Sequence, residues 1–588
     1  APSSPPAPPS PACPPKPIPR PSDPRLPLAQ ADAPEGALRA AAAHKLQLPE
    51  SALARLTVFK RSFDARKADL LAVYIVDVEL ADPAQEAALL ARFAADPHVQ
   101  PTPDMAWRPP VTAPPGWSGE RPVVVGFGPC GIFAALVLAQ LGLKPIVLER
   151  GKPVRERTQD TWGLWRRGEL NPESNVQFGE GGAGLFSDGK LYSQVRDPRH
   201  LGRKVMQEFV DAGAPEEILY VAHPHVGTFK LVKVVENLRA QIIALGGEIR
   251  FQQRVVDVLL NKEHEHQEIR RLVVENLQNG ERCELPARHV VLALGHSARD
   301  AFAMLYRRGV DMVAKPFSIG VRIEHPQGVI DRARWGRHAG HPLLGAADYK
   351  LVHHANNGRT VYSFCMCPGG TVVAATSEPG RVVTNGMSQY SRNERNANAG
   401  LVVGIDPADF PRDAQSFIDT LGESFGAESL PAGQVHPLAG IVLQRQLEAG
   451  AYALGDASYA APAQRVGDFL AQRPSSGPGE VIPSYRPGVL WTDLHAALPA
   501  WATAAMREAL PAFGRKIRGY DMADAVMTGV ETRTSSPLAI RRGDDLQSLN
   551  VRGLYPAGEG AGYAGGILSA GIDGIRVGEA VAQSLLEC

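Results

Sequence analysis

Glycines spaced as G-x-G-x-x-G form one turn of this 588-residue sequence, between a short apolar strand and an apolar helix. The strand covers Arg121 to Val125, and the helix ends near Leu141. The first glycine permits a tight turn, the second lets backbone approach a pyrophosphate, and the third lets the helix pack closely on the strand. The helix N-terminus also offers free N–H groups to phosphate oxygens. The turn therefore predicts a dinucleotide site with contacts from Gly126, Gly128, Pro129, Cys130 and Gly131.

An acidic residue stands where the ribose of a bound dinucleotide would lie. A second strand, Lys144 to Leu148, ends in Glu149, which lies 21 residues beyond Gly128. A carboxylate at this spacing suits the ribose hydroxyls, and the adjacent Arg150 is added to the predicted contacts. The alternative is a glycine-rich turn in an ordinary α/β protein. The order strand, turn, helix, strand and acid favours the dinucleotide site.

Two internal segments favour FAD over NAD. The loop from Asn175 to Lys190 is dense in glycine and can bring backbone N–H groups against a second phosphate and a flavin edge. A strand that begins at Glu248 can present the backbone of Val255 to an adenine, and the strand His289 to Leu294 ends in Gly295. The contacts predicted from these segments are Gly181, Gly182, Ser187, Asp188, Val255 and Gly295.

The C-terminal segment completes the predicted FAD site. It reads LYPAGEGAGYAGG from Leu554 to Gly566 and continues as a helix through Leu586. A strand that ends in glycine and an acid places a carboxylate near a ribitol hydroxyl. The positive end of the following helix would stabilise the negative charge of a reduced flavin. The predicted contacts are Gly558, Glu559, Gly565, Gly566 and Ile567.

Together these segments resemble the glutathione-reductase-type FAD superfamily over residues 120–300 and 551–588. The sequence is most similar to one branch, the FAD-dependent dehydrogenase-like proteins with an extra N-terminal domain. The strings that carry this resemblance are VQFGEGGAGLFSDGKL, KPFSIGVRIEHPQ, SFCMCPGG, VTNGMS, ETRTSSP and YPAGEGAGYAGGI. The resemblance implies bound FAD and redox chemistry, without a settled substrate. Two motifs depart from the superfamily: Gly558-Glu559 replaces the usual Gly-Asp, and Ala293-Leu294-Gly295 replaces Ala-Thr-Gly.

Three groups of residues are candidates for the chemistry beside the flavin. Cys365 and Cys367 form a C-x-C on a predicted loop, where a thiolate could exchange electrons with the flavin. The alternative is two small residues that alternate on a strand end. Lys190 could bear on the flavin or on an anionic substrate, while Asp188 could simply shape a turn.

The third group contains two arginines of the predicted substrate domain. Arg533 is the candidate to bind a carboxylate or phosphate, together with Arg322, Glu324, His325 and Glu531. The alternative is a structural ion pair between strands. None of the 16 histidines has a metal-binding spacing such as H-E-x-x-H, so no metal is predicted.

The fold class predicted is α/β: a Rossmann-like FAD-binding domain, an inserted α+β substrate domain and a small N-terminal α+β domain. The first 24 residues contain 12 prolines, which predicts a disordered tail. The remaining boundaries are the N-terminal domain at 25–108, a linker at 109–119, the FAD domain at 120–300 and 551–588, and the substrate domain at 301–550.

Composition restricts the function further. Lys+Arg and Asp+Glu number 62 each, which disfavours nucleic-acid binding as the main role. Six cysteines are too few for a disulfide scaffold, and no secretory signal is recognisable, so a cytoplasmic protein is expected. The uncharged stretch Val123 to Leu143 is broken by glycines and a proline, so no membrane span is expected.

The sequence thus predicts an FAD-dependent oxidoreductase that acts on a small-molecule or redox-protein substrate, with NADH or NADPH as a transient electron donor. Two alternatives stay open. One is a tRNA-modifying flavoprotein that docks RNA through its N-terminal domain. The other is a flavin-binding sensor or scaffold without turnover.

Overall fold

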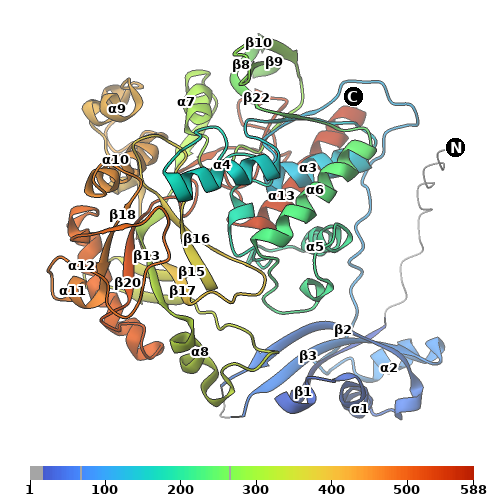
Figure 1. The fold of residues 1–588 in the computed structure, drawn as a ribbon. Helices are drawn as coiled ribbons and strands as arrows, with labels where there is room; N and C mark the ends of the chain where they lie inside the picture. The colour runs from blue at the N-terminus through green and yellow to red at the C-terminus, as the bar shows by residue number, and fades with distance from the viewer. Residues whose placement is uncertain (1–17, 67–68, 264–265, 588) are drawn as a thin grey trace.

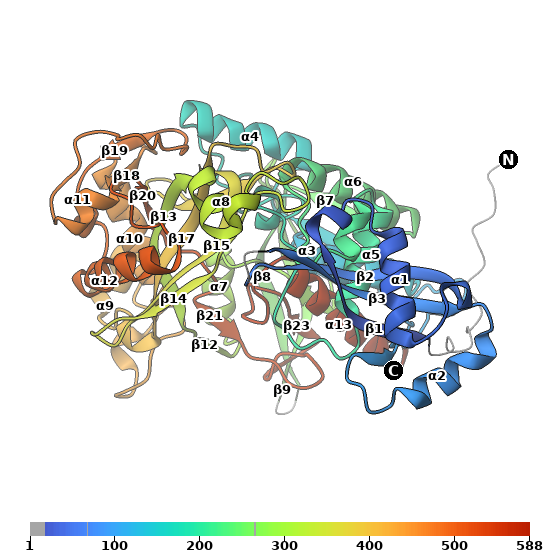
Figure 2. The same cartoon turned by 90° about the horizontal axis from the view of Figure 1, so that it is seen from below.

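A computed structural model describes residues 18–66, 69–263 and 266–587. The N-terminal part is an antiparallel sheet in the order β2-β3-β1-β4. Helices α1 and α2 cover the face of this sheet that points away from the rest of the molecule (Figure 1), and α1 lies across it when seen from below (Figure 2). The elements are β1 (Pro19–Pro27), α1 (Glu35–Leu46), β2 (Leu53–Asp64), β3 (Leu71–Leu80), α2 (Glu86–Arg92) and β4 (Val99–Pro101).

The predicted disordered tail is wrong at its C-terminal end, because β1 begins at Pro19. Proline lacks an N–H but still accepts hydrogen bonds, so it is tolerated where the donor of the strand is not needed. Arg20 lies next to Asp77, with a 2.6 Å ion pair, and Leu26 is buried against the helices. Proline content alone could not indicate these long-range contacts. Residues 1–17 of the predicted tail lie outside the described residues.

A five-stranded parallel sheet in the order β23-β11-β5-β6-β7 forms the second part of the protein. Its strands are β5 (Val123–Val125), β6 (Ile146–Glu149), β7 (Glu248–Phe251), β11 (Val290–Leu292) and β23 (Leu554–Pro556). The C-terminal segment therefore pairs directly with β11, across more than 250 residues of chain. Its helices are α3 (Pro129–Gln140), α4 (Val154–Arg167), α5 (Leu201–Asp211), α6 (Thr228–Ala244), α7 (Arg299–Arg307) and α13 (Ile567–Leu586).

Side-chain alternation explains how this sheet is covered on both faces. Val124, Val147 and Val291 point to the face that packs on α3, α6 and α13. Their neighbours Val123 and Ile146 point to the opposite face, toward α7 and a small second sheet. That sheet contains β8 (Gln253–Glu263), β9 (His266–Asn276), β10 (Arg282–Pro286) and β22 (Val551–Arg552).

A larger sheet, ordered β14-β15-β17-β13-β20-β18-β19 with β16 beside β15, makes up the third part. Its strands are β13 (Phe317–Pro326), β14 (Leu351–His354), β15 (Thr360–Ala374), β16 (Thr384–Ser388), β17 (Asn396–Ile405), β18 (Ala461–Arg465), β19 (Val489–Trp491) and β20 (Val526–Glu531). Two short strands, β12 (Met312–Ala314) and β21 (Leu538–Ile540), pair with each other. In sequence, β12 comes just before the first strand of the larger sheet and β21 just after its last. The surrounding helices are α8 (Gln327–Trp335), α9 (Ala414–Leu421), α10 (Ala439–Leu454), α11 (Val466–Leu470) and α12 (Ala500–Lys516).

No helix in the described ranges combines the length and the apolar character needed to cross a bilayer.

Candidate cofactor and substrate site

The predicted dinucleotide turn lies at the carboxyl end of the parallel strands. Gly126 adopts φ 98°, and a Cβ there would lie 2.3 Å from the carbonyl oxygen of Ala293, at the end of β11. A Cβ on Gly131 would lie 1.9 Å from the carbonyl oxygen of Gly126. Only glycine fits at either position, so α3 can start immediately against the strand. The carboxyl end of such a sheet is where α/β folds bind nucleotides.

The second glycine-rich segment packs directly on this turn. The N–H of Gly181 donates to the carbonyl of Phe127 at 2.8 Å. A Cβ on Gly182 would lie 2.8 Å from the Cα of Gly128. Two segments more than 50 residues apart therefore bring bare backbone to the N-terminus of α3. The first-turn N–H groups of that helix have no acceptor within the helix.

A buried arginine that sequence reasoning missed holds the second segment in place. The guanidinium of Arg157 donates to the carbonyls of Asn175 at 2.8 Å, Val176 at 2.7 Å and Glu180 at 2.7 Å. It is fully buried, and burial lowers its pKa to about 10. The signal in the sequence was an arginine on the buried stripe of α4, between Val154 and Leu164.

Glu149 and Arg150 make contacts within the protein itself. The carboxylate of Glu149 accepts backbone N–H groups from Phe127 and Gly151, each at 2.8 Å, and from Gly179 at 3.0 Å. It therefore ties the first turn to the glycine-rich loop. Arg150 lies over the ring of Phe178 and forms ion pairs with Glu173 and Asp300.

The C-terminal turn converges on the same place. The N–H of Gly558 donates to Asp573 at 2.8 Å, and a Cβ on Gly558 would lie 2.8 Å from the Cβ of Cys130. A Cβ on Gly184 would lie 2.9 Å from Ile567, the first residue of α13. The three predicted segments thus meet around the N-termini of α3 and α13.

Open space lies beside these segments. Gly295, Gly565 and Gly566 are exposed, and a Cβ on any of them would meet no other atom within 4 Å. A cradle of bare backbone with two helix N-termini fits a dinucleotide such as FAD.

Glu559 lies in the C-terminal turn and is partly buried. Burial raises the pKa of its carboxyl to about 7, although the nearby Lys315 acts in the opposite direction. The group is therefore only partly ionised near neutral pH.

Ser187, Asp188 and Val255 also make contacts within the protein. Ser187 Oγ donates to the carbonyl of Gly184 at 2.6 Å and accepts from the N–H of Gly189 at 3.0 Å. Asp188 is buried in an ion pair with Arg392, with a 2.9 Å contact. Val255 pairs with Val274 in the small sheet, next to a β-bulge.

The two cysteines and Lys190 come together although they are far apart in sequence. The amino group of Lys190 donates to the carbonyl of Met366, between Cys365 and Cys367. The predicted loop is wrong here, because both cysteines lie within strand β15. Register shifts on both sides of Cys367 interrupt the pairing with β17, and Cys365 adopts φ 51°. The bulge turns the side chain of Cys365 toward solvent while Cys367 stays buried.

The charge state of these groups argues against a resting thiolate. Although part of Cys365 is open to solvent, desolvation by the protein atoms around its sulfur raises the pKa of the thiol to about 11, with Lys190 and Arg322 opposing the shift. Burial likewise raises the pKa of Cys367. Burial alone would lower the pKa of Lys190, but Asp188 and its other neighbours raise it overall. A cationic amine therefore lies beside two protonated thiols at neutral pH.

The predicted anion-binding arginines are paired inside the protein. Arg533 donates to both carboxylate oxygens of Glu448, at 3.1 and 3.0 Å. Arg322 pairs with Glu531 at 3.0 Å, and its Nη2 lies 3.4 Å from Cys367 Sγ. Both arginines therefore form ion pairs within the protein, which was the alternative to anion binding.

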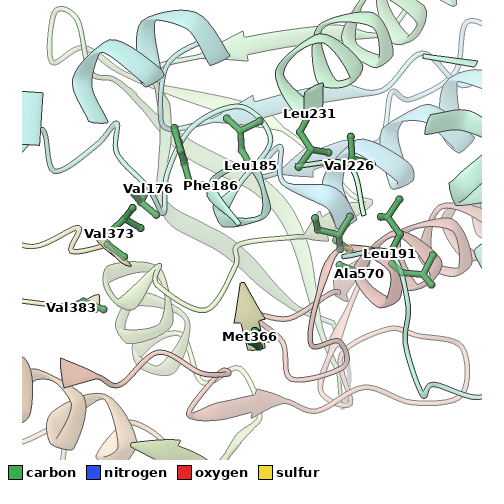
Figure 3. Packing of buried hydrophobic residues seen from close by; sticks show 14 of the residues in the cluster. Val176, Leu185, Phe186, Leu191, Val226, Leu231, Met366, Val373, Val383 and Ala570 are labelled. Atoms are coloured by element: carbon green, nitrogen blue, oxygen red, sulfur yellow. The ribbon is translucent and has the colours of Figure 1, made fainter. Parts of the chain in front are cut away.

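A continuous apolar core connects the flavin-binding candidates to the larger sheet. Figure 3 shows Leu185 and Phe186 of the glycine-rich loop and Val373 of β15 among its members. The loop is therefore packed on both parts of the protein at once.

Family models match two regions of the chain. Residues 316–534 match the FAD-dependent protein, C-terminal domain-like family, and residues 19–79 match a domain of unknown function. The chain is also 45% identical over 546 residues to an uncharacterized protein of Clostridium beijerinckii, covering 92% of this chain and 94% of that one. The chain belongs to the same family as that protein, and within it residues 316–534 are similar to the C-terminal domain of FAD-dependent proteins.

Solved flavoproteins resemble the chain only distantly. A quinol fumarate reductase of E. coli is 12% identical, with a TM-score of 0.32, covering 79% of this chain and 70% of that chain. A geranylgeranyl bacteriochlorophyll reductase-like protein of Thermoplasma acidophilum is 11% identical, with a TM-score of 0.33, covering 79% of each chain.

Proposed function

We propose that this protein is an FAD-dependent oxidoreductase whose cofactor binds along the carboxyl edge of the five-stranded sheet. The observation that carries the proposal is the convergence of three glycine-rich segments on the N-termini of α3 and α13. Close backbone approach, free N–H groups and open space are what a dinucleotide needs.

The residues divide into two halves of a cofactor site. The backbone from Gly126 to Gly131, together with Gly181 and Gly182, suits the pyrophosphate. The start of α13, from Gly565 to Ile567, suits the pyrimidine side of the flavin. There the helix dipole favours negative charge. These assignments extend the resemblance to the glutathione-reductase-type superfamily.

The substrate is proposed to bind between this edge and β15. A bound flavin would supply the electron transfer itself. Lys190 would hold an anionic or polar substrate group, and Cys365 would line the site as a neutral thiol. NADH or NADPH is proposed as a transient donor.

The spectrum of the purified protein tests the proposal. We expect flavin absorbance, and bleaching on anaerobic addition of NADH or NADPH. A colourless protein that takes up no added FAD would contradict the proposal.

A substitution at Gly565 tests the location of the cofactor. A side chain there meets no protein atom within 4 Å of its Cβ, so Gly565→Leu is expected to fold normally while it enters the space assigned to the flavin. FAD should bind at least about tenfold more weakly, or ~1.4 kcal/mol. Gly477→Leu is the matched control, because Gly477 is also a loop glycine with open space at Cβ. Equal FAD affinity in the two variants would contradict the assignment.

A further inference from the structure

His296 follows Gly295 in the loop between β11 and α7, at the open space beside the proposed cofactor site. The residue is partly exposed, whereas the next residue, Ser297, is 5% exposed. Nδ1 of His296 lies 3.1 Å from Ser297 Oγ. Nδ1 faces this buried hydroxyl, whereas Nε2 has no hydrogen-bond partner among the described residues and is not enclosed by them.

A chain of hydrogen bonds decides which way the hydroxyl of Ser297 points. Gln177 Nε2 donates to the carbonyl of Ala375 at 2.9 Å, so the oxygen of that amide faces Ser297. Ser297 Oγ lies 3.1 Å from Gln177 Oε1. An amide oxygen only accepts, so Ser297 uses its single hydrogen on Gln177.

The remaining contacts of Ser297 then indicate which ring nitrogen of His296 carries the proton. Arg533 Nη1 donates to Ser297 Oγ at 3.1 Å and occupies one of its two lone pairs. The second lone pair faces His296. With no hydrogen left on the hydroxyl, Nδ1 must be the donor. The imidazole therefore carries its proton on Nδ1 and a free lone pair on Nε2.

The surroundings also keep this ring uncharged. Although the residue is partly exposed, desolvation by the protein atoms around the ring lowers the pKa of His296 to about 3, and the cations Arg533 and Arg299 act in the same direction. Glu448 opposes them, but both of its oxygens are bonded to these two arginines. The ring stays neutral over the physiological range.

We propose that His296 is a hydrogen-bond acceptor with its proton on Nδ1, which receives the O–H of a ligand through Nε2 at the open space beside Gly295. The hydroxyl belongs either to FAD or to a substrate that carries one. The identity of this ligand rests on the proposed function, whereas the proton position in His296 does not. An experiment can therefore contradict the ligand assignment without contradicting the proton position.

Chemical modification tests the accessible, unprotonated nitrogen. Diethyl pyrocarbonate acylates only unprotonated imidazole nitrogens, and peptide mass mapping locates the product. Between about pH 7.5 and pH 5 a histidine of ordinary pKa should react about 30-fold more slowly, whereas His296 should keep its rate. A His296 that slows like an ordinary histidine, or stays unmodified, would overturn the proposal.

Internal controls come from the same molecule. His223, whose side chain is 62% exposed, reports that the reagent is active, and the fully buried His325 reports that the fold is intact. Modification of His296 in the presence of saturating FAD distinguishes a hydroxyl of the cofactor from one of the substrate. Slower modification with FAD identifies a hydroxyl of the cofactor, and an unchanged rate identifies one of the substrate.

The proton position is tested by ¹⁵N NMR of protein labelled at histidine, with the signal assigned from a His296→Gln variant. Wild type should show a protonated Nδ1 and a bare Nε2, and Ser297→Ala should disturb this pattern. Ser377→Ala is the matched control, because Ser377 also accepts from Arg533 Nη1, at 2.7 Å, and has no recorded hydrogen bond to His296. A proton on Nε2 in wild type would overturn the proposal.

Discussion

Glu149 and Arg157 carry opposite charges, and both hold backbone atoms of the glycine-rich segments. Glu149 accepts three N–H groups, and Arg157 donates to carbonyls of the loop that begins at Asn175. An isolated buried charge is costly, and bonds to backbone dipoles offset that cost. At the scale of single residues, the charged side chains of Glu149 and Arg157 fix the backbone of the glycine-rich segments, whose glycines have no side chains to do so.

Glu559 should make stability depend on pH. Its pKa is raised to about 7 in the folded protein, above the 4.5 of a free glutamate. The folded state therefore binds the proton more tightly, and stability contributed by this group is lost as pH rises from about 4.5 through 7. Relative to Glu559→Gln, wild type should lose up to about 3 kcal/mol over this interval. Urea denaturation at both pH values measures the difference.

Glu587→Gln is the control, because this residue is exposed at the end of α13. It should follow wild type at every pH. If Glu559→Gln also follows wild type, the carboxyl is not held in a buried site.

Helices α3 and α13 pack with almost no side chain between them. A Cβ on Gly574 would lie 2.3 Å from the carbonyl oxygen of Cys130, and one on Gly578 would lie 3.1 Å from that of Ala134. This close contact aligns the N-termini of both helices at the candidate site. At the scale of elements, small residues at this helix contact thus set the position of the groups proposed to bind the cofactor.

Gly574→Ala should separate these helices. The added methyl group cannot fit against backbone, so we expect a loss of at least about 2 kcal/mol in the free energy of unfolding, together with weaker FAD binding. Gly450→Ala in α10 meets no atom within 4 Å and should be neutral or stabilise by up to about 1 kcal/mol. Denaturant unfolding of the two variants side by side tests this contrast, which equal stabilities would contradict.

The N-terminal sheet is joined to the rest of the molecule through several kinds of contact. Backbone of Arg61 pairs with the segment at Tyr220, with bonds of 2.6 and 2.9 Å. Glu579 of α13 accepts from Trp107 at 2.8 Å and from Arg199 at 2.6 Å. Trp107 belongs to the connection between this sheet and β5. At the scale of the whole molecule, the connection is thus anchored on the helix whose other end faces the candidate site.

Glu579→Ala should release this connection. Losing the acceptor leaves the indole N–H of Trp107 and the guanidinium of Arg199 without this partner, so limited proteolysis between residues 102 and 120 should become severalfold faster. Flavin absorbance reports whether the cofactor site is disturbed as well. Glu587→Ala, at the exposed end of the same helix, should be cleaved like wild type. Unchanged cleavage of Glu579→Ala would show that other contacts hold the connection.

Local patterns in the sequence were enough to locate several elements. The strand predicted at Arg121 to Val125 is β5 (Val123–Val125), and the helix predicted to end near Leu141 ends at Gln140. Glycine spacing and hydrophobic runs are local properties, so they can be recognised without neighbours. The tail boundary and the loop at Cys365 were wrong because long-range strand pairing decides both.

What the sequence alone determined is therefore the order of the elements and the presence of three glycine-rich segments suited to a dinucleotide. Only the tertiary structure decided that these segments meet, that Arg533 is paired with Glu448, and that Lys190 reaches the backbone between two cysteines. It also brought Gln177 and Arg533 together on Ser297, on whose contacts the proposed proton position of His296 depends. The physical reason is that hydrogen-bond donors and charges act over a few ångströms of space, and chain folding alone brings such groups together.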